Sequence, residues 1–451
     1  MNSIISDNIA AISTAIGTAG LSVIRISGAT AITEFNQIFK GRDLTKVKSH
    51  TVHYGHIVDE KGAPLDEVMV TVLRNPKTFT TENMVEVSTH GGILVTQKVL
   101  DRILDLDIRL AQPGEFSERA YLNGRIDLVE AESIMDLIHA KSEQALKIAN
   151  LGVHKQTSKL IRDLRQKLIT IIAQIEVHID YPEYDDAIVM SKEIIGPETE
   201  KLLADIAILL KESEKNQMIR EGVKTVIIGK PNVGKSSLLN ALLDEDKAIV
   251  TDIEGTTRDT IEAYVNIQGM TLNLIDTAGI RETEDIVEKI GVKRSKKALE
   301  EAELVLLVLD QSQKLTKEDE VLLDLTKNHK RLIIGNKADL PKALLLEEII
   351  STSTITREGL QDIEKAILKL LQLEDIGSRD FNFLSNVRHI RKVKDAQKSL
   401  EKVLLSIEND MPVDMYAIDL TDAWRSLGEI LGEHYEDDLL DELFSKFCLG
   451  K

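Results

Sequence analysis

The chain has 451 residues, which is enough for two to four domains that each bury a core. Its 56 Lys and Arg residues against 75 Asp and Glu residues give a formal net charge of −19, which disfavours general, sequence-blind binding of nucleic acid. One cysteine excludes an intramolecular disulfide framework, and no stretch approaches the roughly 20 apolar residues of a membrane span. We therefore expect a cytoplasmic protein with no membrane segment, in which any RNA contact is a local basic patch.

Residues 1–118 are predicted to form an α+β domain. Runs rich in β-branched residues predict strands at 21–28, 51–58, 67–73 and 84–92. Helical patterns accompany them at 29–39 and 93–104.

Two segments with a helical pattern, 119–215 and 378–451, lie on either side of a different kind of sequence. Within 159–180 the apolar residues recur at steps of three and four, which predicts one continuous helix. Helical patterns return at 386–410 and 422–432. Because insertions are tolerated where chain ends lie close together, we expect the two segments to form one discontinuous bundle, with residues 216–377 as an inserted α/β domain.

The inserted segment carries the strongest motif, "KTVIIGKPNVGKSSLLNALL", an apolar strand followed by a glycine loop and a helix. Its core, Gly229-x4-Gly234-Lys235-Ser236, is a complete P-loop, in which backbone N–H groups surround phosphate oxygens. Lys235 is expected to reach the β and γ phosphates, and the Ser236 hydroxyl to coordinate Mg²⁺.

The choice of GTP over ATP rests on "LIIGNKADL", where a strand leads into Asn336-Lys337-Ala338-Asp339. A carboxylate can accept hydrogen bonds from both N1–H and the exocyclic amine of guanine, a paired donor edge that adenine lacks. "NLIDTAG" and "VTDIEGTTRD" predict contacts to Mg²⁺ and the γ phosphate, with Thr257 as the second Mg²⁺ ligand. The predicted GTP-binding set is Asn232, Val233, Gly234, Lys235, Ser236, Ser237, Thr251, Asp252, Ile253, Glu254, Gly255, Thr256, Thr257, Asp276, Thr277, Ala278, Gly279, Asn336, Lys337, Ala338, Asp339, Ser353, Thr354 and Ile355.

The residue after the "DTAG" turn is Ile280, where many small GTPases place a glutamine that orients the attacking water. An apolar side chain does not orient water. The nearest carboxylate, Glu282, is therefore the candidate catalytic residue for hydrolysis, with an ordinary solvated loop acid as the alternative.

Over its full length the chain resembles the MnmE (TrmE) family of tRNA-modification GTPases. The resemblance is carried, in order, by "RISG", "HGG", "PGEFSERAYLNGRIDL", "GKPNVGKSS", "GTTRD" and a C-x-G-K end. It implies a tRNA-modifying enzyme that works with the flavoprotein MnmG, as a heterotetramer. The pair would add an aminomethyl or carboxymethylaminomethyl group to C5 of the wobble uridine of certain tRNAs.

The resemblance also implies cofactors and an oligomeric state. The one-carbon unit would come from 5-formyltetrahydrofolate or a related tetrahydrofolate, held by Arg25, Glu86, Arg125 and Lys451. The first domain would form a homodimer. Hydrolysis would be stimulated by K⁺, held by Asn232, Thr251, Ile253 and Thr256.

The lone cysteine, Cys448, lies near the end of the chain, beside Gly450 and Lys451. A nearby cation favours the nucleophilic thiolate, so Cys448 is a candidate catalytic residue of the modification chemistry. The alternative is a packing role beside Phe444 and Phe447. For the whole protein, the rival function is a ribosome-assembly GTPase that binds rRNA, and a nucleotide-locked scaffold is a third possibility.

Overall fold

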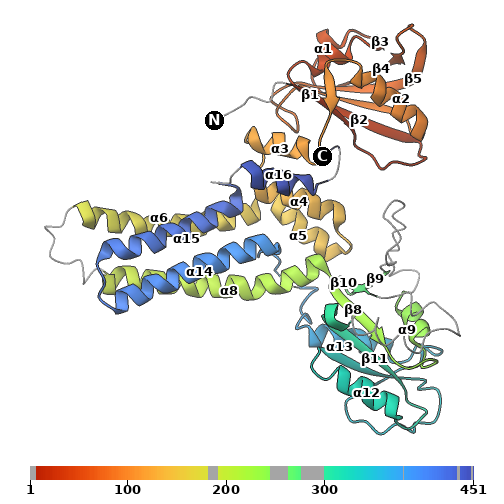
Figure 1. Ribbon diagram of the computed structural model, residues 1–451, viewed down its shortest axis with the longest axis vertical. Coiled ribbons are helices and arrows are strands. Elements are labelled where there is room, and N and C mark those ends of the chain that lie inside the picture. The colour runs from red at the N-terminus through yellow and green to blue at the C-terminus, as the bar shows by residue number, and fades with distance from the viewer. Residues whose placement is uncertain are drawn as a thin grey trace. The chain divides into compact units, whose positions relative to one another are not determined.

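The computed structural model describes residues 7–180, 191–243, 263–275, 299–378, 380–433, 437–447 and 450. The chain divides into two compact units (Figure 1). One comprises residues 1–135 with 427–451, and the other comprises residues 136–426. The sequence-based division into four segments, with boundaries at 118, 215 and 377, stays a prediction.

The first unit contains a seven-stranded mixed sheet with the order β3-β4-β5-β6-β2-β1-β7. Every neighbouring pair is antiparallel except β1 and β7. The strands are β1 Asn8–Ile12, β2 Leu21–Ser27, β3 Phe39–Gly41, β4 Thr51–Val58, β5 Pro64–Leu73, β6 Met84–His90 and β7 Ile108–Leu110. The four predicted strands are confirmed.

Two helices, α1 (Ala31–Phe35) and α2 (Ile93–Leu104), cover one face of this sheet. Alternate strand residues such as Ile24, Val70 and Val87 point toward them and form the core, as the period of two in a strand requires. The predicted helix over 93–104 is confirmed. The one predicted over 29–39 is shorter, because the chain from Phe39 onward pairs with β4 as an edge strand.

Helices α3 (Glu115–Leu122) and α16 (Asp437–Ser445) complete the first unit, and α4 (Leu128–His139) runs from it into the second. An apolar cluster joins α3 to α16 through Ala120, Leu440 and Phe444.

The second unit begins with a helical bundle formed by α5 (Glu143–Val153), α6 (Gln156–Asp180), α8 (Gly196–Glu221), α14 (Val387–Glu408) and α15 (Val413–Leu431). Helix α14 packs along α8, although the two helices lie on opposite sides of the inserted domain in the sequence. The buried Arg165 guanidinium of α6 lies 4.1 Å from the ring of Trp424 in α15. These contacts confirm that the two helical segments form one bundle. Within the described part of the chain, every helix is too short or too polar to cross a lipid bilayer.

The C-terminal end of α8 binds the segment that leads from the inserted domain back to the bundle. The buried Asn216 amide donates to the carbonyl of Phe381 (3.0 Å), and the Ser213 hydroxyl accepts from the backbone of Leu384 (3.1 Å). Only Gly222 separates α8 from the next strand. The bundle and the inserted sheet are therefore joined directly.

The inserted domain has a six-stranded sheet with the order β13-β12-β11-β8-β10-β9. All neighbours are parallel except β9 and β10. The strands are β8 Val223–Ile228, β9 Ala263–Ile267, β10 Met270–Leu274, β11 Leu304–Asp310, β12 Arg331–Asn336 and β13 Ile350–Ser351. The described helices of this domain are α9 (Lys235–Leu242), α12 (Lys317–Leu325) and α13 (Leu360–Leu370). Strand β11 is buried along its whole length, as expected of a central parallel strand covered on both faces.

A buried ion cluster in the first unit centres on Arg119, of which 1% is exposed. Its guanidinium donates to Glu115 (2.9 Å), Asp7 (2.8 Å) and Glu82 (3.2 Å). Burial alone would raise the pKa of Glu115, but hydrogen bonds from Arg109, Arg119 and the backbone outweigh burial and hold that pKa below its ordinary value of 4.5. Ionised Glu115 therefore stabilises the fold above that pH, and the contribution is lost as the pH falls through the lower, folded-state pKa.

We expect Arg119→Met to lower the free energy of unfolding of the first unit by about 3–5 kcal/mol, because it leaves buried carboxylates without their cation. Urea unfolding would measure this change. The matched control is Lys98→Met, which removes an exposed cation from α2 and is expected to change stability by less than about 0.5 kcal/mol. Equal effects of the two substitutions would contradict the stabilising role of the cluster.

Candidate functional site

The glycine loop between β8 and α9 has a conformation that only glycine satisfies at its two ends. Gly234 has φ +94°, and a Cβ there would lie 2.1 Å from the Asn336 amide nitrogen. A Cβ on Gly229 would lie 2.3 Å from the carbonyl oxygen of Val308. The strand, loop and helix predicted from "VIIGKPNVGKSS" are therefore present, and close packing against β11 and β12 fixes both ends of the loop.

Lys235 lies over the inside of this loop. Its ammonium donates to the carbonyls of Gly229 (2.9 Å) and Lys230 (2.7 Å), and burial lowers its pKa. Ser236 and Ser237 follow in the first turn of α9. The glycine loop at the start of α9 therefore combines an ammonium with a helix N-terminus and with backbone N–H groups. This combination of groups is suited to binding phosphate.

The Asn336-Lys337-Ala338-Asp339 segment follows directly from β12. The Asn336 side chain donates to the Val233 carbonyl (2.8 Å) and accepts from the backbone N–H of Thr354 (3.3 Å). The Ser353 hydroxyl donates to the Asp339 carboxylate (2.6 Å). The structure thus brings together three predicted parts of the site, namely the P-loop, the Asn-Lys-Ala-Asp segment and the Ser353–Thr354 loop. Ile355 points outward and is 81% exposed.

Asp310 belongs to this site although the sequence analysis did not select it. It ends β11, and its carboxylate accepts from the Lys337 ammonium at 2.7 Å. Burial alone would raise the pKa of Asp310, but Lys337 and Ser312 outweigh burial and lower it. The sequence signal that could have identified Asp310 is its place as the one acid at the end of an otherwise apolar strand, "LVLLVLD".

Lys230 and Asp319 form a second ion pair that the sequence analysis missed, at 2.7 Å. Lys230 is the second residue of the P-loop, and Asp319 lies in the first turn of α12. No motif connects these two positions.

Several predicted site residues lie outside the described residues. They are Thr251, Asp252, Ile253, Glu254, Gly255, Thr256, Thr257, Asp276, Thr277, Ala278, Gly279, Ile280, Glu282, Cys448 and Lys451. Of the predicted K⁺ ligands, Asn232 is described. It is exposed within the P-loop and has φ +60°.

Three of the four predicted folate residues lie close together on the side of the first sheet opposite α1 and α2. Arg25 and Glu86 face each other across β2 and β6, with the Arg25 Nε 3.0 Å from the Glu86 carboxylate. The guanidinium carbons of Arg25 and Arg125 lie 5.9 and 6.0 Å from the ring centroid of Phe79. Arg25 also donates to the carbonyl of Gly450 at 3.3 Å, so the residue before Lys451 lies at this cluster.

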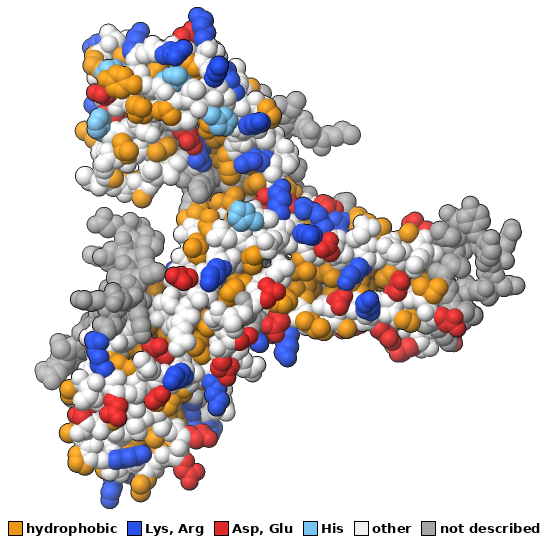
Figure 2. All heavy atoms as spheres, turned by 180° about the vertical axis from the view of Figure 1, so that it is seen from behind, with side chains coloured by type: hydrophobic (Ala, Val, Ile, Leu, Met, Phe, Trp, Pro, Cys, Tyr) orange, Lys and Arg blue, Asp and Glu red, His pale blue; other side chains and the backbone are white. Residues whose placement is uncertain are grey.

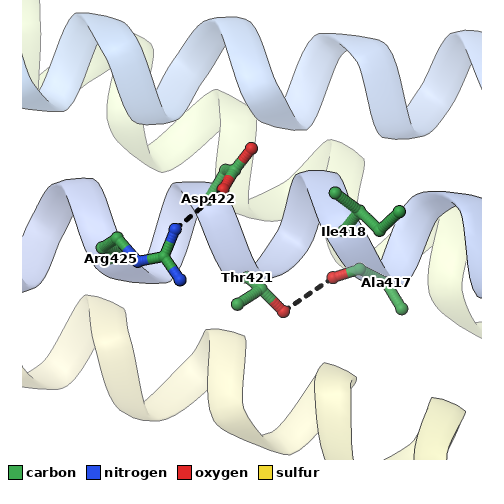
Figure 3. A pocket seen from close by; sticks show the side chains of 5 residues that line it. All are labelled: Ala417, Ile418, Thr421, Asp422 and Arg425. Atoms are coloured by element: carbon green, nitrogen blue, oxygen red, sulfur yellow. Dashed lines mark hydrogen bonds and ion pairs between the residues drawn. The ribbon is translucent and has the colours of Figure 1, made fainter.

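A shallow groove of about 320 Å³ runs along α15 (Figure 3). Its polar side chains already have partners: Thr421 donates to the Ala417 carbonyl (2.7 Å), and Arg425 pairs with Asp422 (3.4 Å). None of its lining residues belongs to a predicted site, so it is a weak candidate for a binding site.

Five parallel strands carry a glycine loop after β8 and the Asn336-Lys337-Ala338-Asp339 segment after β12, at the same edge of the sheet. This arrangement defines a P-loop protein of the guanine nucleotide-binding class.

Comparisons with known proteins give the family. Residues 8–125 match the model of the GTP-binding protein TrmE N-terminus, and residues 128–448 match that of the MnmE helical domain. The chain is 65% identical over 443 residues to the tRNA modification GTPase MnmE of Acholeplasma laidlawii, covering 98% of this chain and 99% of that protein. It is 50% identical over 455 residues to the MnmE of Bacillus mycoides, covering 99% of each. The chain belongs to the MnmE family of tRNA modification GTPases.

Solved structures also resemble part of the chain. The G domain of the T. maritima FeoB iron transporter is 28% identical over 33% of this chain and 98% of its own, with a TM-score of 0.24. Era from Aquifex aeolicus, bound to GDP and an aluminium fluoride, is 25% identical over 39% of this chain and 66% of its own, with a TM-score of 0.26. Scores this low support no inference about function.

We expect Asp339→Asn to weaken GDP binding and strengthen binding of xanthosine diphosphate, because the amide no longer accepts both hydrogen bonds from guanine. One hydrogen bond to a charged group is worth about 1.5–3 kcal/mol, so GDP affinity should fall at least about tenfold. Competitive displacement of a fluorescent guanine nucleotide would measure both constants. The control is Asp324→Asn, an exposed acid on α12. An unchanged preference for GDP over xanthosine diphosphate would remove Asp339 from base recognition.

Proposed function

We propose that this protein hydrolyses GTP and, with the flavoprotein MnmG, adds an aminomethyl or carboxymethylaminomethyl group to C5 of the wobble uridine of certain tRNAs. The one-carbon unit would come from a tetrahydrofolate. The observation that carries the proposal is the presence, in one chain, of a guanine nucleotide site and a separate cluster of two guanidiniums and a carboxylate around Phe79. The relatives described above carry the name tRNA modification GTPase.

The nucleotide part rests on groups that stabilise phosphate charge. The P-loop N–H groups and the Lys235 ammonium would bind the β and γ phosphates, while Ser236 and Thr257 would hold Mg²⁺, which neutralises charge on those oxygens. Ser236 fits this role, since its hydroxyl is in the first turn of α9 beside Lys235. Asn232 fits a K⁺ ligand, because it offers a carboxamide oxygen at an exposed point of the same loop.

The folate part rests on complementary charge. The Glu86 carboxylate can accept hydrogen bonds from the donor edge of a pterin, and the guanidiniums of Arg25 and Arg125 can pair with glutamyl carboxylates. Both the Arg25 and the Glu86 side chains are partly exposed, so a ligand has access to them. When bound, a tetrahydrofolate supplies a one-carbon unit. The residues of this chain bind and orient it.

A homodimer through the first unit is supported by exposed apolar side chains on the sheet face opposite α1 and α2. Tyr54 and Met69 are opposite each other on β4 and β5, and Leu21 and Val52 share their face. These four residues are from 46% to 66% exposed. Exposed apolar side chains grouped on one face mark interaction surfaces, and these lie on the same face of the sheet as Arg25 and Glu86.

The rRNA-binding alternative receives no support from the surface charge. On the face shown in Figure 2, Lys and Arg side chains are interspersed with Asp and Glu over the bundle, so the described part of the bundle has no broad basic area on that face. Phosphate-dominated binding requires such an area or stripe.

The decisive experiment is a nucleoside analysis of bulk tRNA from a strain that lacks this gene. We expect the modified wobble uridines to disappear and to return when the wild-type gene is supplied. Ribosomal subunit profiles from the same strains provide the control. Normal uridine modification together with accumulated immature subunits would overturn the proposal in favour of the ribosome-assembly function.

Cys448→Ser tests the catalytic thiol in the same strain. We expect the variant to keep near wild-type thermal stability and GTP hydrolysis but to fail to restore the modification, since serine removes most of the nucleophilicity. Full restoration by the serine variant would assign Cys448 to packing.

We expect Glu282→Ala to keep GDP affinity and to lower kcat by about 100-fold, the lower end of what a positioned acid or base contributes. We also expect K⁺ to stimulate turnover and Na⁺ not to replace it. Single-turnover and steady-state phosphate release in the two salts would measure both effects. Equal rates in K⁺ and Na⁺ would remove Asn232 from the mechanism and indicate an arginine, with Arg258 as the candidate.

A further inference from the structure

The P-loop is attached to a neighbouring helix by a side chain that its motif leaves unspecified. Lys230 points away from the inside of the loop, and its ammonium donates to the Asp319 carboxylate (2.7 Å) and the Thr316 hydroxyl (2.9 Å). Thr316 is the N-cap of α12, and Asp319 forms the capping box with it. The second residue of the loop is therefore bound to the start of α12.

This ion pair is largely buried, unlike most pairs on the protein surface. The exposed fractions of the Lys230 and Asp319 side chains are 14% and 5%. Burial alone would raise the pKa of Asp319, but hydrogen bonds from Lys230 and Thr316 outweigh burial and lower it. Asp319 Oδ1 is buried with no hydrogen-bond partner among the described residues, so removal of this carboxylate from water is incompletely compensated. The cost of removing two charges from water offsets much of the attraction within such a pair, so the pair contributes little net stability.

The geometry that the pair fixes is that of the phosphate-binding backbone. The carbonyl of Lys230 accepts a hydrogen bond from the Lys235 ammonium (2.7 Å), so the backbone of the anchored residue contacts the phosphate-binding lysine. Three residues later, the Val233 carbonyl accepts from the Asn336 side chain (2.8 Å). The turn between these two attachments contains Pro231 and Asn232, and Asn232 has φ +60°.

We propose that Lys230 and Asp319 are positioning residues for phosphate binding. The pair holds the first half of the P-loop against α12, so that the backbone N–H groups of the loop remain directed at the β phosphate. The inference rests on the nucleotide-binding part of the proposed function and is independent of the tRNA chemistry.

The test compares nucleotides that differ only in phosphate number. GMP lacks the β phosphate around which the loop closes, while it keeps the base that Asp339 reads. For Lys230→Met and for Asp319→Asn, we expect GDP affinity to fall about tenfold, because one charge-assisted contact no longer orders the loop, and GMP affinity to change less than about twofold. The double variant should lose no more GDP affinity than either single one, because the two residues act as a unit.

Matched controls separate positioning from stability. Lys327→Met and Asp324→Asn break an exposed pair on the same helix segment, with side chains 58% and 73% exposed, and should leave both affinities unchanged. Lys230→Arg keeps the cation and should recover much of the GDP affinity. Thr316→Val removes the hydroxyl contact but keeps both charges, and it should give a smaller loss, which offers a milder variant if Asp319→Asn folds poorly. Thermal unfolding is measured for every variant.

The outcomes distinguish the explanations. A selective loss of GDP over GMP affinity, coupled between Lys230 and Asp319, supports the proposal. Equal losses for GMP and GDP, or a lower Tm with unchanged GDP affinity, would overturn it and leave the pair with a purely structural role. A wild-type protein that binds neither GDP nor GTP would overturn the proposed function instead.

Discussion

The nucleotide site depends on the hydrogen bond from the Asn336 side chain to the Val233 carbonyl, 103 residues apart in the chain. This bond joins the P-loop, which is proposed to bind phosphate, to the Asn336-Lys337-Ala338-Asp339 segment, which is proposed to bind the base. The register of the sheet makes it possible: β8 pairs with β11 and β11 with β12, all in parallel, so the loop after β8 and the segment after β12 leave the sheet at the same edge. The Asn336 side chain then spans the end of the buried β11 between them.

Around that bond, each of the two motifs is supported by an acid from a part of the chain that carries no motif. Asp310 holds Lys337 beside the base-reading segment, and Asp319 holds Lys230 at the start of the P-loop. Both acids are buried and ionised, and both receive additional hydrogen bonds from hydroxyls, Ser312 for the one and Thr316 for the other. In the proposed nucleotide site, these acids hold the side chains of Lys337 and Lys230 in place.

The sequence was sufficient for the elements whose signal is local. The strands over 21–27 and 84–90, the helix over 93–104 and the strand–loop–helix of the P-loop follow from β-branched runs, helical periodicity and glycine spacing. Contacts between residues far apart in the chain could not be predicted from the sequence. Lys230 and Asp319, for example, pair only because β11 and α12 place them together. A further example is the carbonyl of Gly450, which accepts hydrogen bonds from Ser13 and Arg25. These residues are 437 and 425 positions away from Gly450 in the chain. The edge strand β3 was missed because three residues are too few to show an alternating pattern.

The direct passage from α8 to β8 has a mechanical consequence. The 26-residue helix has a length of about 39 Å at 1.5 Å per residue, and only Gly222 separates it from the strand that leads to the P-loop. With Asn216 and Ser213 bound to the returning segment, both connections between the bundle and the inserted sheet lie at the same end of α8. A rotation of about 5° at Gly222 would displace the far end of α8 by about 3 Å, so a small change of angle beside the inserted sheet would be enlarged at the far end of this helix.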